Sequence, residues 1–273
     1  MITFPNCKIN LGLNILRKRE DGFHDLSTVF YPISLFDALE IIPNHEVSSN
    51  TEFNCTGLDI NLTDAVNLCV KAFQLVKQDY PALPSVRIHL HKSIPIGAGL
   101  GGGSADAAFM LKMLKDKFSL PISDKQLQEY AALLGSDCAF FLRNKPCLAT
   151  GRGEILEDID INLTNYKIVV VNPGIHINTA TAFSQVNPSV PLMGIREIVT
   201  LHIGQWKDLL INDFEGPVFS RFPQIKEVKE QLYGQGAIYA AMSGSGSSLF
   251  GIFESKQPTP VFTGRDYFIK SFG

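Results

Sequence analysis

The chain has 273 residues, of which 45% are hydrophobic and 19% are charged, and its formal net charge is -3. This length is enough for two hydrophobic cores or for one large core. The mild acidic balance lacks the basic footprint of a nucleic-acid-binding protein. We therefore expect no nucleic-acid partner. A polar partner should be a small molecule that binds at one local site.

The five cysteines, at positions 7, 55, 69, 138 and 147, include no CxxC pair. Their odd number and spacing argue against a disulfide framework or a structural zinc site, and favour buried thiols in a reducing cytosol. The N-terminus lacks the basic and apolar regions of a signal peptide. No run approaches the ~20 apolar residues that span a bilayer. We expect a soluble, cytoplasmic protein with no membrane partner.

The first predicted strand covers residues 9–15, where apolar and polar residues alternate, so that one face lies in the core. Lys8 and Asn10 share the other face. Residues 17–22 end in Asp-Gly and predict a hairpin turn before a return strand over 26–30. Further strands are expected at 38–42, near Phe53 and at 86–90, and a helix at 64–78.

Two helices are predicted after a glycine-rich stretch: an amphipathic helix reaching Phe118 and one that begins at Ser123, with Gln126 completing a capping box and Gly135 at its end. Later strands are expected at 168–171, 237–242 and 249–253, and helices at 195–200, 206–212 and 225–233. A small-residue turn spans 243–248. The pattern predicts two α+β domains, over residues 1–154 and 155–273.

The glycine-rich stretch places five glycines between positions 97 and 103, just before a helix. Such a density destabilises a chain unless the backbone needs positive φ or a ligand must approach closely. The N-terminus of a helix has free N–H groups and a partial positive charge. Together these features predict a phosphate-binding loop. A flexible surface loop is the alternative.

Three known phosphate loops fit poorly. Gly97, Gly99 and Gly102 satisfy the dinucleotide fingerprint literally, but a spacer separates the loop from the preceding strand, and a second helix follows the first. Gly103 stands where the Walker A lysine should be. The HRD and DFG motifs of protein kinases are absent.

The segment Pro95–Ala108 resembles the second motif of the GHMP small-molecule kinases, roughly Pro-x-x-x-Gly-Leu-Gly-[Gly/Ser]-[Gly/Ser]-Ser-Ala. Its triple glycine is similar to the branch of that family whose acceptor is 4-diphosphocytidyl-2-C-methyl-D-erythritol. Four further segments match that branch in order: Lys8-Ile9-Asn10-Leu11, Arg19–His24, Gly135–Phe140 and Ser243–Gly246. Two positions depart from the pattern, because Phe23 replaces a tyrosine and Ala139 replaces a proline.

The resemblance implies a two-domain GHMP kinase fold, with an N-terminal ATP-binding α+β domain and a C-terminal ferredoxin-like α+β domain that contributes to substrate binding. It implies that ATP phosphorylates the 2-hydroxyl of the cytidylylated methylerythritol, in non-mevalonate isoprenoid precursor biosynthesis. Asp137 would be the catalytic base, and Lys8 would keep it ionised. From the residues alone, a helix N-cap for Asp137 and a solvated surface position for Lys8 stay open.

The family positions that imply ATP binding are Pro95, Ile96, Gly97, Ala98, Gly99, Leu100, Gly101, Gly102, Gly103, Ser104, Ala105, Lys92, Asn67 and Leu68. Ser104 is the expected hydroxyl contact of Mg²⁺, which should arrive with the nucleotide because no carboxylate cage is visible.

On the acceptor side, the resemblance places Phe23 and Phe183 on the two faces of the cytosine ring and His24 at its edge. Thr179 is placed for substrate contact, and Asn10 for holding a substrate hydroxyl. A core position for Phe183 and a turn position for His24 are the structural alternatives.

Two other functions remain as alternatives: a GHMP kinase with mevalonate, homoserine or a sugar as acceptor, and a non-catalytic nucleotide-binding module on the same fold. Arg19–His24 argues against the first, and Lys8 together with Asp137 argues against the second. The expected oligomeric state is a monomer or a homodimer.

Overall fold

The computed structural model describes residues 1–44, 51–58, 67–262 and 266–273. They form two compact units, each discontinuous in sequence. The first unit comprises Met1–Cys7, Ser34–Ile96 and Gly101–Asn144, and the second comprises Lys8–Ile33, Gly97–Leu100 and Lys145–Gly273. A functional division between residues 154 and 155 stays a prediction.

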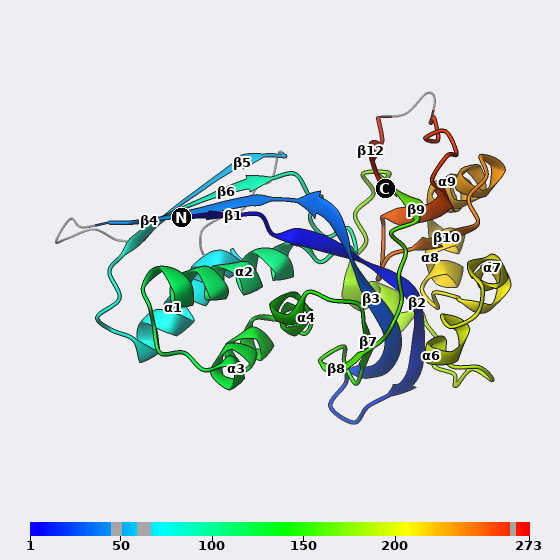
Figure 1. Cartoon of the computed structure of the whole chain (residues 1–273). Coiled ribbons are helices and arrows are strands. Elements are labelled where there is room, and N and C mark those ends of the chain that lie inside the picture. Colours follow the sequence, from blue (N-terminus) through cyan, green and yellow to red (C-terminus); the bar gives the residue numbers. More distant parts are fainter. Residues whose placement is uncertain (45–50, 59–66, 263–265) are drawn as a thin grey trace. The chain divides into compact units, whose positions relative to one another are not determined.

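The first unit contains a four-stranded sheet in the order β1-β4-β6-β5. These strands are β1 (Ile2–Thr3), β4 (Ala38–Pro43), β5 (Glu52–Gly57) and β6 (Val86–Lys92). Only the β5–β6 pairing is parallel among them. One face of the sheet is covered by α1 (Leu68–Asp79) and α2 (Gly102–Lys117) (Figure 1). The same unit contains α3 (Asp124–Leu134) and α4 (Cys138–Arg143).

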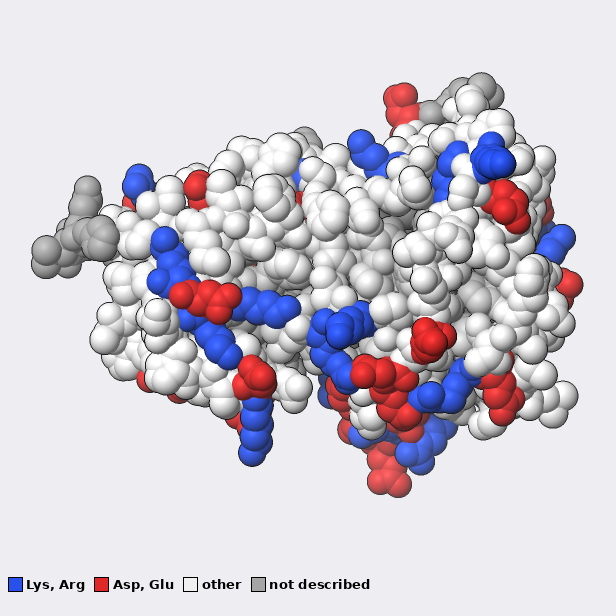
Figure 2. Space-filling model, viewed as in Figure 1, with Lys and Arg blue, Asp and Glu red and all other residues white. Residues whose placement is uncertain are grey.

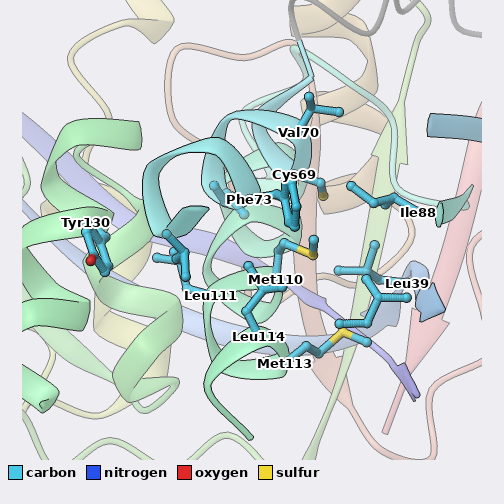
Figure 3. Packing of buried hydrophobic residues seen from close by; sticks show 14 of the residues in the cluster. Leu39, Cys69, Val70, Phe73, Ile88, Met110, Leu111, Met113, Leu114 and Tyr130 are labelled. Carbon is cyan, nitrogen blue, oxygen red and sulfur yellow. The ribbon is translucent and has the colours of Figure 1, made fainter. Parts of the chain in front are cut away.

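The core of the first unit is built where apolar faces of α1 and α2 meet the sheet. Phe73 of α1 and Met110 of α2 belong to one buried cluster with Leu39 and Ile88 of the strands (Figure 3). Fully burying one such side chain is worth about 1.5–3 kcal/mol. This packing fixes the direction of α2, and therefore the position of its N-terminus.

The second unit contains an antiparallel sheet in the order β10-β11-β9-β12. Its strands are β9 (Tyr166–Asn172), β10 (Tyr239–Met242), β11 (Leu249–Glu254) and β12 (Phe268–Phe272). A second sheet, in the order β2-β3-β7-β8, is formed by β2 (Asn6–Lys18), β3 (His24–Phe36), β7 (Cys147–Thr150) and β8 (Ile155–Asp158). The later helices are α5 (Thr179–Ser184), α6 (Ile195–Ile198), the 3-10 helix η2 (Ile203–Gln205), α7 (Trp206–Leu209), α8 (Glu215–Arg221) and α9 (Pro223–Gly234).

The predicted α+β class and the main periodic elements are confirmed. The helix expected at 64–78 is described from Leu68, because Asn67 is its extended N-cap, while residues 64–66 lie outside the described residues. Ser123 caps α3 as predicted, since its hydroxyl accepts from the N–H of Gln126. The sequence missed α4, α5, α8, the 3-10 helix η2 and the strands β1, β7, β8 and β12.

Surface charge is mixed on the face shown in Figure 2, where acidic and basic side chains alternate around large uncharged areas. Within the described residues, no helix combines the length and apolar character required to cross a membrane. Four of the five cysteine side chains are buried, as the sequence predicted.

Candidate active site

The glycine loop has the backbone conformation that its composition predicts. Gly97, Gly99 and Gly101 have φ values of +64°, +79° and +71°. Gly101 is the N-cap of α2, and no side chain caps that end of the helix. The first N–H groups of α2 are therefore left for an anion, which the helix dipole also favours.

Close approach explains two of these glycines. A Cβ on Gly99 would lie 1.9 Å from the carbonyl oxygen of Ser243, and a Cβ on Gly102 would lie 2.8 Å from Cγ2 of Ile94. Gly103 is different, because its Cβ would meet only Leu68, at 3.8 Å. The physical need for glycine is thus confirmed at each position of the loop except Gly103.

The polar face of β2 is buried. Lys8 and Asn10 are only 3% and 2% exposed, so the surface-lysine alternative is wrong. The Lys8 ammonium donates to Asn10 Oδ1 at 2.5 Å and to the carbonyl oxygen of Gly99 at 3.1 Å, and it lies 4.9 Å from the ring centroid of Phe30. The glycine loop therefore holds the lysine by a main-chain acceptor.

Two residues that sequence reasoning did not select orient Asn10. Its Nδ2 donates to the hydroxyl of Thr28 at 2.9 Å, and its backbone N–H donates to Ser243 Oγ at 3.2 Å. Thr28 in turn donates to the carbonyl oxygen of Gly12, and Ser243 to that of Gly99. Because Thr28 takes the amide donor, Oδ1 faces Lys8. The sequence signal that could have identified Thr28 is a hydroxyl residue on the buried face of β3.

Asp137 lies in the first unit, at the N-terminal end of α4. Asp137 occupies the N-cap position of α4, as the capping alternative expects, but its side chain makes no capping hydrogen bond there. Ser104 lies against the same turn, because a Cβ on Gly135 would be 3.9 Å from Ser104 Oγ and 3.6 Å from Cys138 Sγ. Burial raises the pKa of the Cys138 thiol to about 12. Ala139 continues α4 at a position that tolerates either alanine or proline.

The residues expected near adenine have structural roles as well. Asn67 caps α1, with its Oδ1 accepting from the N–H of Cys69 at 2.8 Å, and Leu68 begins that helix beside Gly103. The Lys92 side chain is fully buried and forms ion pairs with Asp37 and with Asp106. A nucleotide could reach its ammonium only by replacing one of these partners.

Three residues expected on the acceptor side gather in the second unit. His24 stacks on Phe183, with ring centroids 5.1 Å apart and an interplanar angle of 25°. Phe183 also packs edge-on against Phe214 at 4.8 Å, and Thr179 Oγ1 lies 3.2 Å from Ser245 Oγ. A base that stacks on the same face of Phe183 would have to displace the imidazole.

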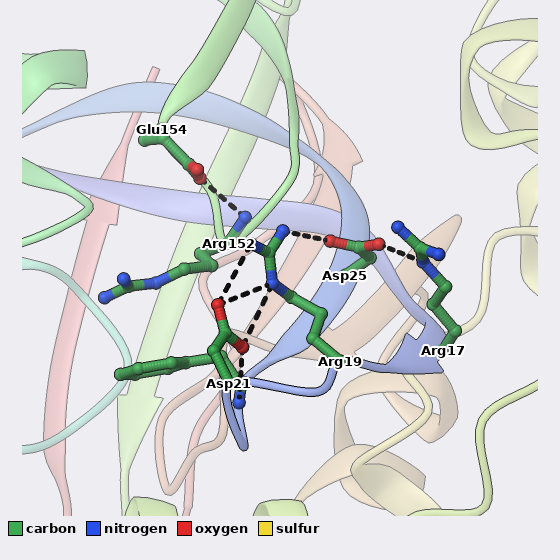
Figure 4. A network of polar contacts seen from close by, with 7 residues as sticks. Arg17, Arg19, Asp21, Asp25, Arg152 and Glu154 are labelled. Carbon is green, nitrogen blue, oxygen red and sulfur yellow. Dashed lines mark hydrogen bonds and ion pairs between the residues drawn. The ribbon is translucent and has the colours of Figure 1, made fainter.

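Phe23 is half exposed and its ring is covered by Arg152, whose guanidinium carbon lies 3.7 Å from the ring centroid. The hairpin that carries Phe23 is braced by the ionic network in Figure 4. Arg17 and Arg19 bind Asp25 and hold the pKa of its carboxyl below the usual value, and Arg19 does the same for Asp21. The network fixes the turn between β2 and β3.

Among the described residues, no three His, Cys, Asp or Glu side chains converge as a metal site. Mg²⁺ that bridges nucleotide phosphates usually keeps several waters and takes one or two carboxylates from the protein. Ser104 at the start of α2 offers a hydroxyl oxygen, which fits such an ion as a further ligand. Lys8 and Asp137 belong to different units, and their pairing stays a prediction.

Comparison with known families gives matches in both halves of the chain. Residues 67–145 match the GHMP kinases N terminal domain, and residues 196–259 match the GHMP kinases C terminal domain. The chain belongs to the GHMP kinase family. Membership confirms the two-domain GHMP kinase fold and makes the chain a kinase that uses ATP.

Three proteins similar to this GHMP kinase are named for the same acceptor. The 4-diphosphocytidyl-2-C-methyl-D-erythritol kinase of Bacteroides fragilis is 52% identical, over 94% of this chain and 93% of its own length. The enzyme of the same name from Cytophaga hutchinsonii is 50% identical, over 95% and 94%. A crystal structure of 4-(cytidine 5'-diphospho)-2C-methyl-D-erythritol kinase is 34% identical, with a TM-score of 0.79 over 92% of this chain and 90% of that one.

Proposed function

We propose that the chain transfers the γ-phosphoryl group of ATP to the 2-hydroxyl of 4-diphosphocytidyl-2-C-methyl-D-erythritol, a step of non-mevalonate isoprenoid precursor biosynthesis. The observation that carries this proposal is the sequence identity of 50–52%, over nearly the whole chain, with kinases named for that acceptor. The hairpin Arg19–His24, which the network of Figure 4 braces, supports the cytidylylated acceptor over other GHMP kinase acceptors.

In the proposed mechanism, Asp137 accepts the proton of the attacking hydroxyl, and the Lys8 ammonium stabilises the charged form of Asp137 and the developing alkoxide. Asn10 positions Lys8, because its Oδ1 accepts a 2.5 Å hydrogen bond from the Lys8 ammonium. Gly99 of the loop accepts a hydrogen bond from Lys8, and Ser104 lies beside Gly135 in the turn that leads to Asp137.

The uncapped N–H groups of α2 would bind the ATP phosphates, and Asn67 and Leu68 would flank the adenine. Mg²⁺ would neutralise phosphate charge, with Ser104 as its protein contact. Phosphoryl transfer depends mainly on positioning and charge neutralisation, which suits a site built from backbone amides and one lysine. We further propose that the protein acts in the cytoplasm as a monomer or homodimer, with no nucleic-acid partner.

The decisive test measures ADP release with the cytidylylated acceptor, in a coupled assay. The wild-type protein should turn over, and Asp137→Ala should lose about 10²–10⁴ in kcat, as expected for a general base. Asp124→Ala is the control, because the Asp124 carboxylate is exposed and forms an ion pair with Lys115. Asp137→Ala activity within threefold of wild type would remove Asp137 from the mechanism.

A panel with mevalonate, homoserine and a sugar tests the alternative acceptors in the same assay. We expect turnover only with the cytidylylated compound. A preference for another acceptor would refute the proposed substrate and leave the kinase assignment intact. ATP binding without turnover of any acceptor would favour the non-catalytic module.

A further inference from the structure

A buried ionic triad lies beneath the start of α2, within the first unit. Lys92 at the end of β6 donates to Asp106 Oδ2 at 2.8 Å and forms a second ion pair with Asp37. The side chains of Lys92 and Asp37 are 0% exposed, and that of Asp106 is 4% exposed. The three residues come from β6, α2 and the junction between β3 and β4.

The triad joins the two ends of the glycine loop. Lys92 precedes the loop in sequence, and Asp106 follows it in the second turn of α2. Asp37 also accepts the backbone N–H groups of Ser93 at 2.6 Å and Ile94 at 2.9 Å, so it binds the segment that leads into the loop. The start of the loop and the start of α2 are thereby attached to one another through side chains.

The packing around the triad leaves little room for movement. A Cβ on Gly102 would lie 2.8 Å from Cγ2 of Ile94 and 3.4 Å from Nζ of Lys92. The first residue of α2 therefore rests directly on the residues that the triad holds. A shift of Lys92 would be transmitted to the N–H groups at this helix terminus.

Stability alone is a poor explanation for this arrangement. Two carboxylates oppose one ammonium, and Asp106 Oδ1 has no hydrogen-bond partner among the described residues. Burial raises the pKa of Asp106 to about 7 even though Lys92 opposes the shift. Buried ion pairs often contribute less than apolar residues of the same volume, and an unpaired buried oxygen costs about 1–3 kcal/mol.

We propose that Lys92, Asp37 and Asp106 act as a clasp that positions the phosphate loop, and that Lys92 supports ATP binding through this clasp instead of through contact of its ammonium with the nucleotide. The inference rests on the proposed use of the loop for ATP. The three are positioning residues, because they act on the loop backbone. If the clasp keeps the loop competent, releasing one end raises the apparent dissociation constant by the reciprocal of the competent fraction that remains.

Asp106→Ala is the informative substitution, because it releases α2 while Lys92 and Asp37 remain a neutral pair. Lys92→Met would leave two buried carboxylates without a counter-charge and is avoided. Asp106→Asn is the conservative rescue, since its amide oxygen can still accept from Lys92. Asp79→Ala is the control: Asp79 accepts from the hydroxyl of Tyr130 in the same unit and joins α1 to α3.

Binding of MgADP by calorimetry and the melting temperature are measured for all four proteins. We expect Asp106→Ala to raise the dissociation constant for MgADP about tenfold. This corresponds to a competent loop in about a tenth of the molecules. The dissociation constant of Asp106→Asn for MgADP should stay within threefold of the wild-type value. Asp79→Ala should lower the melting temperature without weakening MgADP binding. Equal weakening by both alanine variants, or binding within twofold of wild type in a folded Asp106→Ala, would overturn the clasp.

Amide hydrogen exchange over residues 96–103, without nucleotide, tests the clasp independently of any activity. Asp106→Ala should exchange faster there than wild type, and Asp79→Ala should not. If wild-type protein fails to bind MgADP, the proposed function fails, whereas the exchange result still supports or refutes the clasp. Unchanged exchange in Asp106→Ala would refute it.

Discussion

The glycine loop permits a graded test, because its glycines are required for different reasons. Gly97 has a positive φ, but a Cβ there would make only ordinary contact with His176, at 3.5 Å. Gly99 combines a positive φ with a Cβ position 1.9 Å from the carbonyl oxygen of Ser243. Gly103 has neither restriction, since its nearest neighbour would be Leu68 at 3.8 Å.

These differences set the expected free energies of unfolding. Gly97→Ala should cost about 1–2 kcal/mol, the penalty for placing an L-residue in the left-handed region. Gly99→Ala adds a backbone clash that requires a movement of roughly 1.5 Å to restore ordinary contact, so its cost should exceed about 3 kcal/mol. Gly103→Ala replaces glycine within a helix and should stabilise by about 0.5–1 kcal/mol.

Urea unfolding, followed by circular dichroism, measures all three variants under one condition. The midpoints should fall in the order Gly103→Ala, wild type, Gly97→Ala, Gly99→Ala. A Gly99→Ala variant as stable as Gly97→Ala would refute the close contact between the loop and Ser243. Destabilisation by Gly103→Ala would show that the start of α2 is more crowded than the 3.8 Å distance indicates.

Three further outcomes are expected. Lys8→Met should fold, because the two side chains have similar length, but should lose at least about 10² in kcat; wild-type kcat would exclude a role for the ammonium. Phe183→Ala should raise the KM for the acceptor far more than that for ATP, and equal effects would make Phe183 a core residue only. The raised pKa of Asp106, about 7, means that its stabilising contribution is present below pH 4 and is lost as pH rises through 7. Asp106→Asn should therefore remove a few kcal/mol of pH dependence between pH 4 and 8, as measured by unfolding midpoints.

Periodicity located the strands and long helices, but it could not show what covers a polar face. Alternation placed Lys8 and Asn10 together on β2, yet every residue from Asn6 to Ile15 is buried. A pattern of period two separates the two faces and does not distinguish solvent from a buried hydrogen-bond network. The contacts of Thr28 and Ser243 with Asn10 depend on β3 and on a turn more than two hundred residues away in sequence.

Short elements escaped prediction for a different reason. Helices α4 and α5 have six residues each, too few for a period of 3.6 to become visible. The start of α5 is set by a side-chain cap, in which Asn178 accepts from the N–H of Thr181. The triad left a clearer sign, because Asp106 is a charged residue among the small apolar residues that begin α2. Its partner Asp37 could be found only from the tertiary structure.

The loop presents two kinds of backbone group, and the two proposed roles can be separated on that basis. The carbonyl oxygen of Gly99 accepts from Lys8 and from Ser243, whereas the N–H groups that follow Gly101 are available to phosphate. Gly99→Ala moves the carbonyl that holds Lys8, so it should lower kcat and also raise the KM for ATP. Asp106→Ala releases only the helix end, so it should raise the KM for ATP and leave kcat at saturating ATP within threefold. If both variants lowered kcat alike, the loop would act as one rigid body, and the division between its carbonyl and N–H groups would have no functional meaning.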